Sequence, residues 1–216
     1  MSQPLAVLTL ASLVILIGCE RPIETIRASG DFRFERGDYA AAAPEYAEIT
    51  ARYPGDWQAH YRLGQSLLQI GKPAEARHAL EIAHSRRPHD SHVADALAEA
   101  MYQQGDETRL FAFLRERAES TQNVDAYLRL ARYAVDLSDP DSAKVALEAA
   151  IEFDDGRTVE PYLEAAAFAL RLGDVDLALR RLHQAYSVSP RDNRVRQRIR
   201  DLGEVPGPTL ALPPGN

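Results

Sequence analysis

The stretch from Trp57 to Asp90, WQAHYRLGQSLLQIGKPAEARHALEIAHSRRPHD, decides the fold of this chain. Gly71 divides it into two segments, and glycine is the residue that most easily takes the left-handed conformation that ends a helix. Gly64 in the first segment and Ala76 in the second are small enough to let two helices approach closely. The stretch therefore predicts a hairpin of two helices.

The same pattern recurs along the chain with a period of 34 residues. Small residues stand 34 positions apart at Gly30, Gly64 and Ala98, and a glycine follows each of them seven residues later. The pattern divides the chain into five units, at residues 23–56, 57–90, 91–123, 124–158 and 159–192. A single hairpin cannot bury its own apolar stripe, so we expect the five units to stack.

These residues, with Leu63 before Gly64 and Pro88 near the end of its unit, resemble the tetratricopeptide repeat. The resemblance implies an all-α, right-handed solenoid of about five helix hairpins that binds other proteins and catalyses no reaction. Residues 193–203 would form a helix that caps its end. Four arginines cover one face of that helix, so a basic patch facing a membrane is the alternative. Residues 204–216 contain four prolines, and we expect a disordered tail.

The composition excludes several classes of protein. The 216 residues include 25 Lys and Arg against 32 Asp and Glu, and the net charge of −7 disfavours a nucleic-acid binder, which needs a basic face. Hydrophobic residues at 45% and charged residues at 26% are typical of a globular chain rather than a disordered or multi-span membrane protein. The one cysteine cannot form an internal disulfide or a thiolate zinc site.

The sequence contains no motif of a known catalytic site. It lacks a glycine-rich phosphate loop, a His-Glu-x-x-His helix and a nucleophile elbow. Five of the six histidines lie between His60 and His92, but His78 and His84 are six residues apart and would face largely opposite sides of a helix. We therefore predict no enzyme, no metal site and no small-molecule substrate.

The amino-terminal segment differs from the rest of the chain because every charged residue lies beyond position 19. The uncharged run from Leu5 to Ile17 would span about 20 Å as a helix, which is too short for a hydrocarbon core of about 30 Å. A short apolar run that ends in small residues indicates a secretory signal peptide, here residues 1–18. The basic residues that usually precede such a run are missing from residues 1–4.

The residues Leu16-Ile17-Gly18-Cys19 resemble the bacterial lipobox. The resemblance implies cleavage between Gly18 and Cys19, a covalent lipid on Cys19 as the only added group, and residues 19–22 as a short linker. Acyl chains would then hold the protein on a membrane of the bacterial envelope. Glu20, which is not Asp, favours the periplasmic side of the outer membrane. An uncleaved anchor or an ordinary buried cysteine is the alternative.

The family resemblance also implies a concave face that takes part in protein binding, lined by positions 2, 5, 9, 12 and 13 of each unit, of which positions 5, 9 and 12 supply the predicted groove residues. Position 12 is apolar in every unit, and the alternative is that it packs between neighbouring helices. The predicted groove residues are Arg27, Asp31, Phe34, Tyr61, Gln65, Leu68, Asp95, Glu99, Tyr102, Leu128, Arg132, Val135, Leu163 and Leu170.

The layout of a lipobox followed directly by repeats resembles the assembly lipoproteins of type IV and Tad pili. It implies a membrane-anchored scaffold that binds other envelope proteins during assembly of a pilus or secretion complex. Two alternatives remain open at this point: a structural module whose solenoids stack end to end, and an adaptor for a periplasmic hydrolase.

Overall fold

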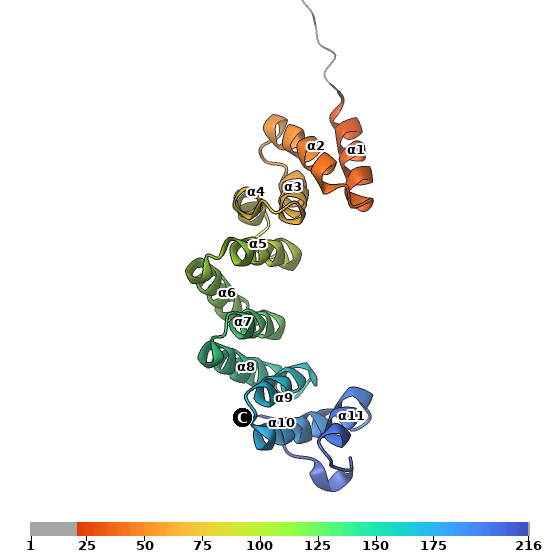
Figure 1. The fold of residues 1–216 in the computed structure, drawn as a ribbon, viewed down its shortest axis with the longest axis vertical. Helices are drawn as coiled ribbons and strands as arrows, with labels where there is room; N and C mark the ends of the chain where they lie inside the picture. The colour runs from red at the N-terminus through yellow and green to blue at the C-terminus, as the bar shows by residue number, and fades with distance from the viewer. Residues whose placement is uncertain (1–20, 216) are drawn as a thin grey trace, which may run out of the picture. The chain divides into compact units, whose positions relative to one another are not determined.

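The described part of the chain is helical. A computed structural model describes residues 21–215, and within this range there are helices and turns but no strand. The predicted all-α fold is confirmed, and none of the described helices is long and apolar enough to span a bilayer. The helices (Figure 1) are α1 Ile23–Glu35, α2 Tyr39–Arg52, α3 Trp57–Gln69, α4 Pro73–Arg86, α5 Ser91–Gln104, α6 Glu107–Thr121, α7 Val124–Asp136, α8 Pro140–Asp154, α9 Glu160–Arg171, α10 Val175–Val188, α11 Asn193–Asp201 and the 3₁₀ helix η1 Pro208–Leu210.

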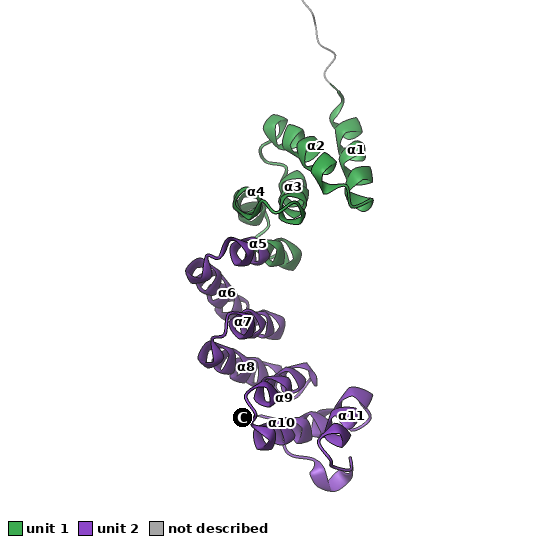
Figure 2. Ribbon diagram, viewed as in Figure 1, with its two compact units in different colours: residues 1–97 green, residues 98–216 purple. Residues whose placement is uncertain are grey.

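The chain divides into two compact units, Met1–Leu97 and Ala98–Asn216, with the division inside α5 (Figure 2). In the first unit, α1 packs on α2, α2 on α3 and α3 on α4. In the second unit, α7 packs on α8, α8 on α9 and α9 on α10. The helix pairs α1–α2, α3–α4, α7–α8 and α9–α10 thus pack together, as predicted for the hairpins of the first, second, fourth and fifth units.

Residues in the left-handed conformation separate the paired helices, as predicted for the recurring glycines. Ser138 takes this conformation before α8, with a φ of 60°. Asp139, the next residue, caps α8 by accepting a hydrogen bond from the N–H of Ser142 at 3.1 Å. Four glycines take the same conformation at the corresponding turns, with φ from 72° to 78°: Gly37, Gly71, Gly105 and Gly173.

The small residues let paired helices approach closely. A Cβ atom added at Gly64 on α3 would lie 2.4 Å from Cγ of Leu80 on α4, and Leu80 is fully buried. A Cβ atom at Gly30 on α1 would meet the ring of Tyr46 on α2 at 3.2 Å. The contact between α3 and α4 therefore excludes any side chain at Gly64.

The helix predicted after the last unit is present as α11. It buries Val195 and Ile199 completely, and Nη1 of its Arg198 donates a hydrogen bond to the carbonyl of Leu163 on α9 at 2.9 Å. The exposed guanidinium of Arg194 pairs with Glu160 at the start of α9 at 2.9 Å. α11 thus buries an apolar face, and one hydrogen bond and one ion pair join it to α9.

The tail differs from the expected disorder. Residues 204–215 run back to α10, beside which Figure 1 marks the end of the chain. Nε2 of Gln184 on α10 donates a hydrogen bond to the carbonyl of Gly215 at 2.6 Å, and Nη1 of Arg181 donates to the same carbonyl at 3.2 Å. The proline content led us to expect a disordered tail. Proline content gives no information about the side chains of α10 that hold the backbone of the tail.

Candidate functional site

Three predicted groove residues of the first unit line one hollow of about 360 Å³. These are Arg27 and Asp31 from α1 and Tyr61 from α3, and the guanidinium of Arg27 pairs with the carboxylate of Asp56. Asp31 Oδ1 accepts a hydrogen bond from the hydroxyl of Tyr46 at 2.7 Å. The hollow therefore combines aromatic rings with charged groups whose positions are fixed by hydrogen bonds.

The phenol groups around this hollow stay neutral at physiological pH. Burial raises the pKa of Tyr46 above its usual range, and the hydrogen bond to Asp31 raises it further. Burial is also the main cause of the raised pKa of Tyr61, whose hydroxyl accepts a hydrogen bond from Nε2 of Gln65 at 2.9 Å. Each hydroxyl thus keeps its hydrogen, which makes it a donor as well as an acceptor.

The side chains of Phe34 and Leu68 pack against neighbouring residues and do not form an open surface. The ring of Phe34 lies edge-on to the rings of Tyr39 and Tyr46, with centroids 5.1 and 6.4 Å apart, and the guanidinium of Arg62 lies 4.4 Å from its centroid. Leu68 is only 8% exposed. For Leu68, the structure agrees with the alternative that position 12 packs between helices.

A second hollow, of about 270 Å³, lies in the second unit. The predicted residues Leu128, Arg132 and Val135 on α7 line it together with Glu164 and Phe168 on α9. Sequence reasoning missed Glu164 and Phe168 because it used only fixed positions of the repeat. Each follows a predicted position by one residue, so the helical arrangement places it at the edge of the same face.

The remaining predicted residues lie outside these two hollows. Glu99 accepts hydrogen bonds from the hydroxyl of Tyr133 at 3.1 Å and from Nε2 of Gln103 at 2.8 Å, and the ring of Tyr102 lies 5.3 Å from that of Tyr133. Asp95 is half-buried on α5. Leu170 is exposed on α9.

Leu163 does not face an open groove. It is 6% exposed, and its carbonyl accepts the hydrogen bond from Arg198 on α11. α11 contacts α9 at this point, as the first helix of a further repeat would. Gly18 and Cys19 lie outside the described residues, so cleavage and lipid attachment stay predictions. Within residues 21–215, no group of three or more His, Cys, Asp or Glu side chains could hold a metal ion.

Comparisons with known proteins agree with the repeat pattern. Two family models described as tetratricopeptide repeat match residues 33–100 and 124–156. No curated protein matches the chain.

Solved structures with a similar fold share little sequence with this chain. MamA is 18% identical, with a TM-score of 0.60, over 86% of this chain and 98% of that one. PilW, described as a widely conserved type IV pilus biogenesis factor, is 14% identical with a TM-score of 0.58, over 82% of each chain. A protein from Thermus thermophilus, described as a thermophilic TPR protein, is 21% identical with a TM-score of 0.50, over 84% of this chain and 98% of that one. Identities this low show similarity of fold alone.

Proposed function

We propose that this chain is a non-enzymatic scaffold that binds other proteins of the bacterial envelope through its predicted groove residues, because residues 33–100 and 124–156 match tetratricopeptide-repeat models. The observation that carries the proposal is the pair of hollows lined by these residues, one in each unit. Their walls mix aromatic, aliphatic and charged side chains. Tyrosine and arginine in such settings are the residue types that contribute most to protein–protein affinity.

The anchor and the pathway belong to the same proposal. A lipid on Cys19 would hold the scaffold on the membrane, most simply on the periplasmic side of the outer membrane, and the lipobox supports this. Assembly of a pilus or secretion complex is the proposed role. The fold similarity to PilW is consistent with that role but does not carry it.

Crosslinking in intact cells, followed by mass spectrometry, tests the groove. We expect the double variant Tyr61→Ala and Tyr102→Ala to lose at least one crosslinked envelope protein, because it removes one predicted groove ring from each unit. Since both rings are half-buried, a second variant is needed that leaves packing unchanged. Arg132→Glu serves this purpose, because Arg132 is exposed and lines the second hollow.

Tyr53→Ala is the matched control, since Tyr53 is 54% exposed and outside the predicted set. Partner profiles that are the same in the control, the double variant and Arg132→Glu would contradict a binding role for these residues. A hydrolase among the lost partners would favour the adaptor function. Self-association that persists in light scattering of all variants would favour the structural module.

A further inference from the structure

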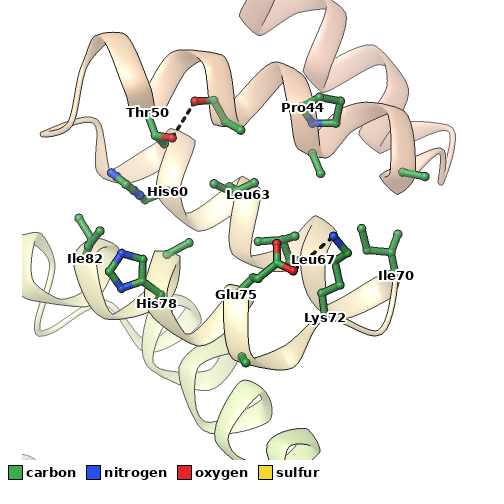
Figure 3. Close-up of a pocket in the computed structure, with 15 residues that line it drawn as sticks. Pro44, Thr50, His60, Leu63, Leu67, Ile70, Lys72, Glu75, His78 and Ile82 are labelled. Atoms are coloured by element: carbon green, nitrogen blue, oxygen red, sulfur yellow. Dashed lines mark hydrogen bonds and ion pairs between the residues drawn. The ribbon is translucent and has the colours of Figure 1, made fainter.

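An apolar cleft lies between α2, α3 and α4, on residues that are not among the predicted groove residues. Its volume is about 790 Å³, and we call it the α2–α4 cleft. In Figure 3, α3 contributes Leu63 and Leu67, while Ile82 comes from α4 and Pro44 from α2. The ion pair of Lys72 and Glu75, at 3.3 Å, is on its rim.

The repeat pattern relates this cleft to a second place in the chain that holds a peptide segment. Residues of the second and fifth units correspond at a separation of 102, which is three periods of 34. His60, Ala79 and Ile82 of the α2–α4 cleft thus correspond to Tyr162, Arg181 and Gln184. These three residues hold the end of the chain, and we call them the tail site.

The tail is held at this site by its backbone. The N–H of Gly215 donates a hydrogen bond to the hydroxyl of Tyr162 at 3.2 Å. Gln184 Nε2 donates to the carbonyls of Pro213 and Gly215, at 3.3 and 2.6 Å. Arg181 Nη1 donates to the carbonyl of Gly215 at 3.2 Å. Backbone contacts of this kind do not depend on most side chains of the bound segment.

Close packing accompanies these hydrogen bonds. A Cβ atom added at Gly156, in the turn between α8 and α9, would lie 2.8 Å from Cγ of Pro214. The segment from Pro208 to Gly215, Pro-Thr-Leu-Ala-Leu-Pro-Pro-Gly, carries no charged side chain. The fifth unit therefore binds residues 213–215, the end of an uncharged segment that begins with the 3₁₀ helix Pro208–Leu210.

His60 gives the α2–α4 cleft a polar group at the position of Tyr162. It is 7% exposed, and its Nε2 lies 3.1 Å from the carbonyl of Pro54. Because a carbonyl can only accept, Nε2 carries the hydrogen and Nδ1 is an acceptor. Within the described chain, Nδ1 has no hydrogen-bond partner. Burial lowers the pKa of His60, which favours this neutral form.

Pro44 removes the usual helical donor from the carbonyl of a residue that lines the same cleft. Proline has no N–H, so Pro44 cannot donate to the carbonyl of Ala40 one helical turn earlier. Both residues line the cleft. A bound segment that offers a backbone N–H can satisfy this carbonyl, whereas a charged side chain would lose its hydration against the apolar walls without compensation.

We propose that the α2–α4 cleft binds an uncharged segment of a partner protein that contains proline and leucine, at the place that corresponds to the tail site of the fifth unit. Because Ala79 and Ile82 stand here in place of Arg181 and Gln184, the cleft holds this segment by apolar contacts and through His60. Proline suits this cleft because an extended proline-containing segment loses little conformational entropy on binding. Leucine fits the walls formed by Leu63, Leu67 and Ile82. This proposal goes beyond the predicted groove and does not rest on it.

A fluorescently labelled peptide with the sequence of residues 208–215 is the probe, titrated with the full chain and followed by anisotropy. We expect saturable binding that Ala47→Glu weakens roughly tenfold or more, because Ala47 lines the cleft and is exposed, so that the variant still folds. Ala51→Glu is the matched control on α2, since Ala51 is exposed and does not line the cleft. A peptide with aspartate in place of both leucines should not bind.

The tail site is tested separately, because the free peptide could displace the tail. The double variant Arg181→Ala and Gln184→Ala should leave binding to the α2–α4 cleft unchanged. Binding that falls in this variant but not in Ala47→Glu would place the peptide at the tail site and overturn the proposal. Absence of saturable binding up to about 1 mM would overturn it as well. Tyr61→Ala with Tyr102→Ala should not affect the peptide, which separates this test from that of the groove.

Discussion

Ser138 is in a conformation that the other turns give to glycine. Its φ of 60° matches the turns at Gly37, Gly71, Gly105 and Gly173, and a residue with a Cβ atom is strained there. We expect Ser138→Gly to raise the free energy of unfolding by about 0.5–1 kcal/mol, because relief of strain exceeds the added entropy of the unfolded chain. The urea midpoint measures this change.

The reverse substitution at a matched turn is the control. Gly71 has a φ of 72°, and no atom lies within 4 Å of an added Cβ, so Gly71→Ser introduces only backbone strain. It should lower the free energy of unfolding by a similar amount. If both variants shift the midpoint in the same direction, backbone strain is not the cause.

Gly64 and Gly30 occupy the same position of their units but differ in the space around them. Gly64→Ala forces a methyl group against the buried side chain of Leu80, and we expect a loss of about 2 kcal/mol in the free energy of unfolding. Gly30→Ala needs only a small shift of the Tyr46 ring, and its higher helix propensity offsets about 1 kcal/mol. Its midpoint should therefore stay near that of the wild type. Equal losses in the two variants would contradict this reading of the two contacts.

Residue identity predicted these small-residue contacts, but it did not predict which groove positions are accessible. The close contact at Gly64 and the left-handed turns at the recurring glycines could be predicted, because they depend on the absence of a Cβ atom in glycine. Leu68, Leu128 and Leu163 follow the groove pattern equally well and are all nearly buried, yet Leu128 lines the second hollow whereas Leu68 and Leu163 line neither of the two. Their surroundings depend on the neighbouring helices, and Arg198 on α11, which lies outside the repeats, contacts the carbonyl of Leu163. A fixed repeat position therefore does not determine whether a residue lines a hollow.

At the scale of elements, the docked tail shows what the repeat pattern could have indicated. Arg181 and Gln184 stand where the second unit has Ala79 and Ile82, so two polar residues replace apolar ones on α10. Both are nearly buried, and a buried polar side chain needs a partner. The tail carbonyls are those partners. The two polar residues in an otherwise apolar pattern thus indicated that a partner segment packs on α10. They did not indicate which segment supplies the carbonyls.

α1 and α2 are joined by a nearly buried carboxylate whose charge depends on pH. Glu45 on α2 accepts a hydrogen bond from Ser29 on α1 at 3.1 Å and pairs with Arg21 at 3.0 Å and Arg33 at 3.6 Å. Burial alone would raise the pKa of Glu45. The hydrogen bonds from Arg21 and Ser29 and the charges of Arg21 and Arg33 outweigh burial, so the pKa lies below its usual range.

A lowered pKa in the folded state means that the ionised form of Glu45 stabilises the protein. The contribution is complete above the pKa of the unfolded chain, about 4.3, and is lost as the pH falls through the folded value. We expect Glu45→Gln to lower the urea midpoint at pH 7 and to approach the wild type as the pH falls below about 4. Urea titrations across this range measure the difference.

Glu24→Gln is the matched control, since Glu24 is an exposed carboxylate on α1. Its midpoint should follow that of the wild type at every pH. A gap between Glu45→Gln and the wild type that stays constant down to about pH 3 would show that the charge of Glu45 does not contribute.

At the scale of the whole molecule, the first described residues connect the predicted anchor to the repeats. Arg21 pairs with Glu45 and Glu48 on α2, and Arg52 donates a hydrogen bond to the carbonyl of Arg21 at 2.7 Å. Cys19 precedes Arg21 by two residues, a distance of at most about 7 Å. If Cys19 carries the lipid, these contacts hold the first helix pair close to the membrane surface. The pairing of Arg21 with α2 could not be predicted, because it joins residues 24 and 27 positions apart that belong to no repeat motif.

The anchor itself gives the last prediction. Cys19 is the one cysteine of the chain, so Cys19→Ala should abolish incorporation of labelled palmitate and move the protein out of the membrane fraction. Arg21→Ala is the informative companion, because it removes the contacts with α2 and leaves Cys19 in place. It should keep the label and the membrane fraction, while limited proteolysis near residue 21 becomes faster. Labelling of Cys19→Ala equal to the wild type would exclude Cys19 as the lipid site. Loss of the label with retention in the membrane would instead indicate that the uncharged run from Leu5 to Ile17 stays attached as the anchor.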